Sequence, residues 1–267
     1  MNIGIVGLGV VGSACHYGFS KLGHSVSAHD IKMSTTIRDV SDSDVCFICV
    51  PTPSTEDGKC DVSIVEDVIY QIRKHNRNNI IVIKSTVEPG TTQRLINSLD
   101  SNICFVPEFL RERCSITDFT ENHDLCIIGT DNNEVFEKVK LCHGSYPKKF
   151  VQLSPTEAEI SKYFNNVYNA SLIILANSFY EICQAYGADY SRMKNAIVNR
   201  NHIVDIYLDC NGNFRGFGGM CLPKDVRALA HLAKQKNLNV DFFQNIIDEN
   251  AKYKTTCYEG MRHEPGK

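Results

Sequence analysis

The first half of the chain alternates short apolar runs with longer stretches of helical periodicity. Apolar strands that carry Val and Ile at nearly every position are typical of a parallel sheet covered by helices on both faces. The pattern therefore predicts an α/β fold with a Rossmann-like, doubly wound parallel sheet over residues 1–150. The predicted strands are Ile3–Val6, Ser25–His29, Val45–Val50, Ile80–Lys84, Ile103–Val106 and Leu125–Ile128.

The pattern becomes helical near Lys149–Ser154. Ser154 and Glu157 have the spacing of a capping box, and Pro155 stands at the first helical position between them. Helical periodicity then continues to Gly187, and further helices are predicted around 189–198, 224–236 and 240–254. We therefore expect a second, helical domain over 151–267, built on the long helix.

Composition narrows the class of protein. The net charge of -3 and the absence of a basic tract argue against a nucleic-acid partner. No apolar run approaches the roughly 20 residues that span a bilayer, so no membrane partner is expected. The chain opens directly into a strand, which predicts that there is no signal peptide. Most of the twelve cysteines lie in apolar runs, which is typical of reduced core cysteines in a cytoplasmic protein.

A glycine fingerprint follows the first strand. Gly7, Gly9 and Gly12 enclose Val10 and Val11 at the start of a helix. The first glycine allows a tight turn, the second lets backbone approach a pyrophosphate, and the third lets helix pack on strand.

Asp30, at the end of the second strand, is placed to accept a hydrogen bond from a ribose hydroxyl. Because a carboxylate repels a 2′-phosphate, NAD is expected rather than NADP. Between Asp30 and Val45 there is room for one turn or a short strand at Met33–Asp42, and not for a full helix with a strand. The adenosine side of the site is therefore expected to be trimmed.

Cys221 has the setting of a reactive thiol. Glycine-rich chain leads to it, and a helix is predicted to begin at about Pro223, with Lys224 and Asp225 beside it. A helix N-terminus and a nearby lysine favour the thiolate. A buried structural cysteine is the competing interpretation, and the glycines and adjacent charges favour the nucleophile.

Polar residues also recur along one face of the long helix. Glu159, Lys162, Asn166 and Asn169 are spaced three or four residues apart. A solvated face and a functional stripe are equally compatible with this spacing. Lys162 and Asn166 have the spacing to donate to one developing oxyanion.

Six short motifs occur in one order along residues 1 to about 250. In this set and order the chain resembles the UDP-glucose/GDP-mannose dehydrogenase family. The resemblance implies NAD-dependent oxidation of the C6 alcohol of a nucleotide sugar to a carboxylate, UDP-glucose to UDP-glucuronate foremost. The motifs are GLGVVG (Gly7–Gly12), VPTP (Val50–Pro53), KSTVEPGT (Lys84–Thr91), PEFLRE (Pro107–Glu112), KYFNN (Lys162–Asn166) and GGMCLPKD (Gly218–Asp225).

The resemblance also implies roles for single residues. Cys221 would attack the aldehyde and carry a thioester, while Lys162 and Asn166 hold the oxyanion. Asp225 and Thr86 would place the hydrolytic water, and Glu108 would act as base. The implied cofactor residues are Gly7, Gly9, Val10, Val11, Gly12, Asp30, Pro51, Thr52, Thr86, Glu112 and Lys224. The implied substrate residues are Phe109, Leu110, Arg111, Lys162, Asn166, Arg200, Phe217 and Gly218.

The chain departs from the family pattern after Asp30 and again at its end, because the family's second Rossmann-like domain would follow Lys267. One alternative is therefore an inactive NAD-binding homologue that partners a full-length dehydrogenase. Another is a dehydrogenase for a smaller β-hydroxy acid, which shares the two-part plan, but GGMCLPKD argues against it. The long apolar helix exceeds what a small domain buries, so we expect a homodimer built on it. No metal site is expected.

Overall fold

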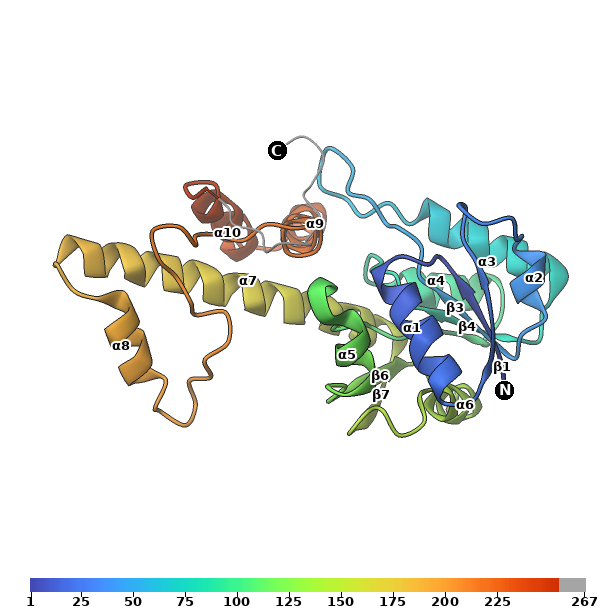
Figure 1. Ribbon diagram of the computed structural model, residues 1–267. Helices are drawn as coiled ribbons and strands as arrows, with labels where there is room; N and C mark the ends of the chain where they lie inside the picture. Colours follow the sequence, from blue (N-terminus) through green and yellow to red (C-terminus); the bar gives the residue numbers. More distant parts are fainter. Residues whose placement is uncertain (255–267) are drawn as a thin grey trace. The chain divides into compact units, whose positions relative to one another are not determined.

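The computed structural model describes residues 1–254, and the expected second domain's residues 255–267 lie outside the described part (Figure 1). The chain forms two compact units. The sheet unit comprises Met1–Thr55 and Cys60–Lys162, and the helical unit comprises Glu56–Lys59 and the chain from Tyr163 onward. The first two turns of the long helix, expected to open the second domain, thus belong to the sheet unit.

The sheet unit contains one seven-stranded sheet of order β2-β1-β3-β4-β5-β6-β7. All neighbouring strands are parallel except β5 and β6, which pair antiparallel at Phe105 and Gly129. The predicted Rossmann-like α/β fold is confirmed. The strands are β1 Asn2–Val6, β2 Ser25–His29, β3 Val45–Ile48, β4 Ile80–Ile83, β5 Ile103–Phe105, β6 Cys126–Gly129 and β7 Phe150–Leu153.

Two differences from the predicted sheet have physical reasons. β7 is half-exposed, so it lacks the continuous apolar run by which the other strands were predicted. The antiparallel direction of β6 was not predicted, because a strand buried at every position looks the same in either direction.

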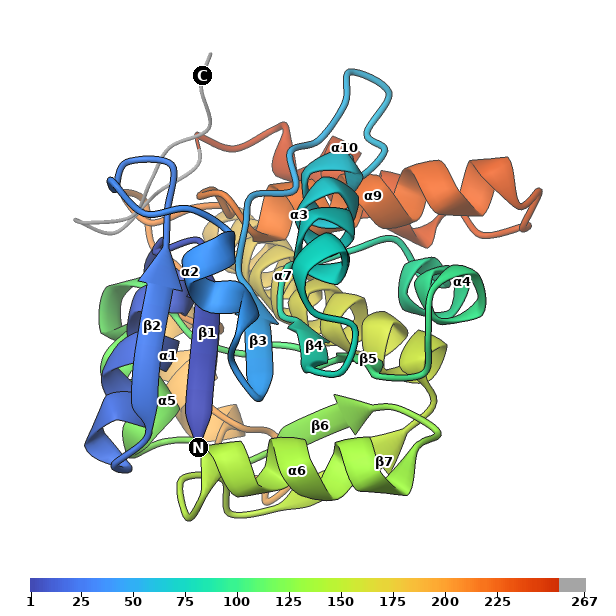
Figure 2. The same cartoon turned by 90° about the vertical axis from the view of Figure 1, so that its right-hand side faces the viewer.

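Helices cover both faces of this sheet (Figures 1 and 2). One face packs against α1, α5 and α6 around Phe19, Phe119 and Val139, and the other against α3 and α4 around Ile69 and Leu95. The single-turn helix α2 lies between β2 and β3, which confirms the short crossover expected there. The helices are α1 Val10–Lys21, α2 Arg38–Ser41, α3 Ser63–His75, α4 Thr91–Ser98, η1 Glu112–Cys114, α5 Ser115–Thr120 and α6 Asn133–His143.

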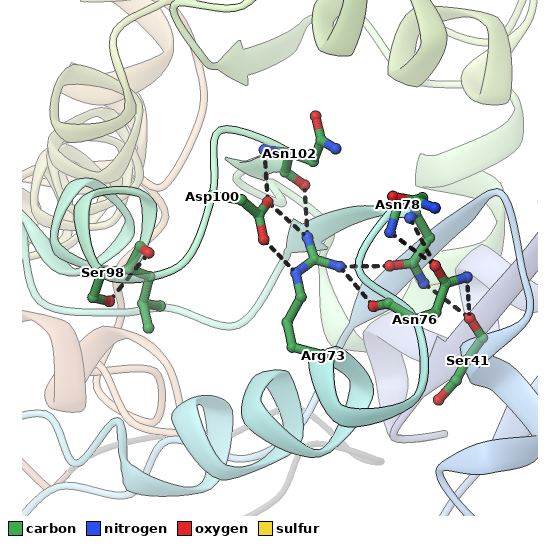
Figure 3. Close-up of polar contacts among 9 residues, drawn as sticks. Ser41, Arg73, Asn76, Asn78, Ser98, Asp100 and Asn102 are labelled. Atoms are coloured by element: carbon green, nitrogen blue, oxygen red, sulfur yellow. Dashed lines mark hydrogen bonds and ion pairs between the residues drawn. The ribbon is translucent and has the colours of Figure 1, made fainter.

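A buried arginine joins the loops that precede β4 and β5 (Figure 3). Arg73, near the end of α3, donates to Asn79 Oδ1 at 2.6 Å and pairs with Asp100 at 2.7 Å. It also donates to the carbonyl of Asn102, and Asn79 in turn donates to the carbonyl of Ser41. Because the guanidinium nitrogens contact both of these loops, the network fixes the end of the sheet at which β4 and β5 begin.

His143, the last residue of α6, is fully buried among aromatic rings. The rings of Phe19 and Phe47 lie 5.3 and 5.8 Å from it, and its Nδ1 lies 2.9 Å from the carbonyl of Val139. Burial lowers the pKa of His143 to about 3 and that of His123 to about 4, from a usual value of 6.5.

These histidines predict acid sensitivity. Below pH 6.5 the unfolded chain takes up protons that the folded sheet unit excludes. Stability is therefore fully present above that pH and is lost progressively as pH falls toward about 4. Urea unfolding midpoints measured from pH 7.5 to 5 test this, and His143→Phe is expected to flatten the decline. An equal decline in the variant would show that His143 does not contribute to it.

The helical unit contains the rest of α7 (Pro155–Ala185), then α8 (Tyr190–Ile197), α9 (Leu222–Gln235) and α10 (Phe242–Asn250). All four correspond to predicted helices. The core of this unit joins Val167 and Ala170 of α7 to Val226 of α9 and Ile246 of α10. Among residues 1–254 no helix is long and apolar enough to cross a bilayer.

Candidate functional site

The glycine turn between β1 and α1 is shaped for close backbone approach. Gly7 has φ +89°, and a Cβ there would stand 2.6 Å from the carbonyl of Cys49. A Cβ on Gly12 would stand 1.8 Å from the Gly7 oxygen, so α1 packs on the turn only with glycine at this position. Nothing lies within 4 Å of a Cβ on Gly9, which leaves open space in front of the helix. Val10 and Val11 are half-buried in the first turn of α1.

Asp30 closes the same site from the end of β2. Its carboxylate accepts hydrogen bonds from the backbone of Leu8 at 2.8 Å and of Lys32 at 3.0 Å. These two bonds hold the pKa of Asp30 below its usual range. An ionised carboxylate beside an open glycine turn at a helix N-terminus fits a dinucleotide with a free 2′-hydroxyl, which is NAD.

Gly9→Ala separates cofactor binding from folding. Because φ at Gly9 is -70° and the space around its Cβ is open, alanine is expected to leave the melting temperature unchanged. The methyl group would occupy the approach to the helix N-terminus, so NAD affinity should fall by about tenfold or more. Calorimetric titration with NAD measures this, with Ser20→Ala in the same helix as control. Equal affinity in Gly9→Ala and the parent would place the dinucleotide elsewhere.

The loops after β3, β4 and β5 lie at the same end of the sheet as the glycine turn, because these strands follow β1 in the sheet order and run parallel to it. Pro51 and Thr52 follow β3, and Thr86 follows β4 in a half-buried position. Ser85 Oγ donates to the carbonyl of Val50 at 2.7 Å and so joins the first two loops. The structure therefore places these predicted cofactor residues, which lie on separate loops, at one end of the sheet.

The loop after β5 contains a buried ion pair. Lys162 Nζ lies 2.8 Å from Glu108 Oε1 and 2.6 Å from the Glu108 carbonyl, and the two side chains are only 5% and 11% exposed. The other oxygen of Glu108 accepts from the backbone of Leu110 at 2.9 Å. The ring of Phe109 lies 5.9 Å from Lys162 Nζ. Lys162 and Glu108 are therefore held in hydrogen-bond contact.

Two other residues of this loop are placed differently. Arg111 forms a two-point ion pair with Asp118, and this pair holds the Asp118 pKa well below its usual range. Glu112 begins the short helix η1 and is half-buried.

Three of the four stripe residues on α7 are buried and Asn169 is half-buried, so the interpretation as a solvated face is wrong. Glu159 is inaccessible and accepts from the backbone N–H groups of Gly90 and Thr92, where it stabilises the start of α4. Asn166, one turn beyond Lys162 on the same helix, is 5% exposed. Glu159 thus has a structural role that the sequence pattern alone did not reveal.

In the helical unit, Cys221 stands at the N-terminus of α9. It is the N-cap residue of that helix, and it is exposed, whereas the other cysteines of residues 1–254 are buried or half-buried. For comparison, burial raises the pKa of the Cys46 thiol to about 12.

Behind Cys221, Asp225 is 1% exposed and accepts from Asn166 Nδ2 at 2.6 Å and from Lys224 Nζ at 2.7 Å. The backbone N–H of Asp225 donates to the Cys221 carbonyl at 3.0 Å. The cysteine is therefore exposed at the end of a buried chain of hydrogen bonds that continues to α7.

Two predicted substrate residues, Phe217 and Gly218, lie in the loop before Cys221, and Phe217 is 4% exposed. Arg200 lies in an exposed turn after α8, and its side chain makes no hydrogen bond or ion pair with the described residues. Sequence reasoning missed Asn177 and Asn250, which hold the backbone of this loop. Asn177 stands in an otherwise apolar helix segment, which is its only sequence signal, whereas Asn250 follows Asp248 and Glu249 and no local pattern marks it.

These features define an NAD-binding α/β protein with a helical unit that exposes a cysteine at a helix N-terminus. Residues 28–145 match the NAD binding domain of the UDP-glucose/GDP-mannose dehydrogenase family, and residues 156–252 match its central domain. The chain belongs to this family.

Individual relatives agree with this assignment. The UDP-glucose 6-dehydrogenase of Rickettsia prowazekii is 29% identical, over 86% of this chain and 54% of the relative. The GDP-mannose 6-dehydrogenase of Pseudomonas aeruginosa is 28% identical, over 94% of this chain and 68% of the relative. The structure of a UDP-glucose dehydrogenase from Pyrobaculum islandicum is similar with a TM-score of 0.85 and 26% identity, over 94% of this chain and 68% of that one. The chain thus spans about half to two thirds of these relatives.

Proposed function

We propose that the protein oxidises the C6 alcohol of a nucleotide sugar to a carboxylate, with UDP-glucose as the first candidate substrate. The observation that carries this proposal is Cys221, exposed at the start of α9 and backed by the buried Asp225–Asn166 pair. Family membership and the similarity to UDP-glucose 6-dehydrogenases support it. NAD, when bound at the glycine turn, would accept the hydride in each of two successive oxidations.

In the proposed reaction the Cys221 thiolate attacks the C6 aldehyde that the first oxidation forms. The resulting thiohemiacetal is oxidised to a thioester, and water then hydrolyses the thioester to the carboxylate. Covalent attachment keeps the aldehyde from escaping and gives the second oxidation a thiohemiacetal to act on.

Lys162 and Asn166 would donate to the oxygen that develops charge during these steps. Glu108 is proposed as the base, because its buried carboxylate lies in direct contact with the proposed oxyanion donor Lys162. Asp225 and Thr86 would place the hydrolytic water. We propose that Lys162, Glu108 and Thr86 of the sheet unit act on the same substrate molecule as the helical unit's Asn166, Cys221 and Asp225.

Other residues are proposed to bind the substrate and the cofactor. We propose that Phe109, Leu110, Phe217 and Gly218 contact the sugar, and that Arg111 and Arg200 contact its charged groups. Pro51, Thr52, Glu112 and Lys224 are proposed to line the cofactor beside the glycine turn.

The activity test is NADH formation, followed at 340 nm, with a panel of UDP-glucose, GDP-mannose and UDP-N-acetylmannosamine. We expect turnover with one sugar nucleotide and none with the free sugars. No absorbance rise with any member of the panel would reject the proposed activity. Turnover only in the presence of a full-length family member would instead favour the alternative of a partner protein.

We also propose that two copies of the chain associate through α7. Large apolar side chains stand exposed at helical spacing along this 31-residue helix. Such a continuous apolar stripe on one helix is typical of an interface, and a second identical helix matches it in length and character. The stripe comprises Ile160, Phe164, Tyr168, Leu175, Phe179, Ile182 and Tyr186.

Light scattering after size exclusion tests the association. The parent protein is expected to have twice the mass of one chain, and Phe179→Asp is expected to have the mass of a single chain. An exposed substitution on another helix, Asn245→Asp, serves as the control. A parent protein with the mass of one chain would reject the dimer.

A further inference from the structure

The segment that leads to Cys221 is held at three consecutive residues by two asparagines. Asn177 of α7 accepts from Arg215 Nε at 2.6 Å and from the Gly216 N–H at 3.2 Å. Asn250, the last residue of α10, accepts from the Phe217 N–H at 2.8 Å and donates to the Phe217 carbonyl at 2.9 Å. One amide side chain therefore pairs with both backbone groups of a single residue, as a neighbouring β-strand would.

Burial makes this pairing necessary. Asn250 is 7% exposed and Phe217 is 4% exposed, so water does not replace the two bonds. The ring of Phe217 is packed in the core that α7, α9 and α10 share, beside Val167, Val226 and Ile246. The backbone of Phe217 is thus fixed relative to three helices of the same unit.

The cysteine itself lies between two such fixed points. After it, the Asp225 N–H donates to the Cys221 carbonyl, and the Asp225 carboxylate is held by Asn166. Before it, Gly218, Gly219 and Met220 separate Cys221 from Phe217, and Gly219 has φ +80°. Glycine leaves this connection flexible unless both ends are held. The anchor at Phe217 therefore decides where the thiol stands relative to the first turn of α9.

We propose that Asn250 is a positioning residue for Cys221. Its amide fixes the Phe217 backbone and thereby keeps the Cys221 thiol at the N-terminus of α9. The consequence for turnover rests on the proposed function, but the placement of the thiol does not. Asn250 acts through the loop and has no contact with substrate or cofactor in this proposal.

The test uses the full chain and two measurements. The first is the pH dependence of Cys221 alkylation by iodoacetamide, read at the level of the Cys221 peptide by mass spectrometry. The second is the rate of NADH formation at varied NAD concentration. The variants are Asn250→Ala and the control Asn245→Ala, an exposed asparagine of the same helix.

In Asn250→Ala the pH midpoint of alkylation is expected to rise by about one unit, because the thiol leaves the helix N-terminus. The kcat should fall by about tenfold or more, while the KM for NAD changes by less than about twofold, since the glycine turn belongs to the other unit. Asn245→Ala should match the parent in both measurements. A general loss of stability would not move the alkylation midpoint of the folded protein.

An unchanged midpoint in folded Asn250→Ala would overturn the proposal. If that variant does not fold, Asn250→Asp replaces it: aspartate keeps the acceptor for the Phe217 N–H but turns a charged oxygen toward the Phe217 carbonyl in place of the donor. An upward shift is again expected, and no shift would overturn the proposal. If the parent forms no NADH with any sugar nucleotide, the proposed function fails, while the alkylation midpoints still decide the role of Asn250.

Discussion

Cys221→Ser is expected to lower formation of the sugar carboxylate from a nucleotide sugar by at least about a thousandfold, because the thioester cannot form without the thiolate. Cys221 is exposed at the helix terminus, so its replacement should leave the melting temperature unchanged. NAD affinity should also be unchanged, since the glycine turn belongs to the sheet unit.

The matched control for this variant is Cys114→Ser, a half-exposed cysteine at the end of η1. We expect it to retain the parental rate. A Cys221→Ser protein that forms the carboxylate at more than a tenth of the parental rate would exclude the covalent route and leave the cysteine with a binding role at most.

Lys162→Met is expected to have the second largest effect, on both stability and turnover. The substitution leaves Glu108 buried without its cation, and breaking such a pair costs about 3–5 kcal/mol in the free energy of unfolding. Loss of the oxyanion donor should also lower kcat by about a hundredfold or more. Urea unfolding and NADH formation measure the two effects separately.

The double variant Lys162→Met/Glu108→Gln separates the structural cause from the catalytic one. Removing the stranded charge should restore most of the stability, because a neutral amide tolerates this environment better than a carboxylate does. Turnover should remain as low as in Lys162→Met. Recovery of turnover together with stability would mean that the ion pair only supports the fold.

The sequence was sufficient to predict the elements that are strongly apolar or carry glycine. All six predicted strands are present, because a strand buried on both faces leaves few polar positions. The one-turn crossover at α2 followed from chain length alone. The half-exposed β7 and the direction of β6 were not predictable, since neither changes the local pattern of apolar residues.

Individual residues of the candidate site could be predicted only where they belong to a recognisable sequence motif. Cys221 stood out by its glycines and by the proline at the start of α9. The partners of Asn166 and Lys162 are distant in sequence, so only the fold shows that Asp225 and Glu108 lie against them. The same holds for Asn250, whose pairing with Phe217 depends on the packing of α10 on α9 rather than on any local pattern.

The ratio of NADH formed to nucleotide sugar consumed distinguishes a double oxidation at Cys221 from a single one. With limiting UDP-glucose and excess NAD, run to completion, we expect two NADH for each UDP-glucuronate formed and no accumulation of aldehyde. A ratio of one, with the aldehyde released into solution, would contradict it.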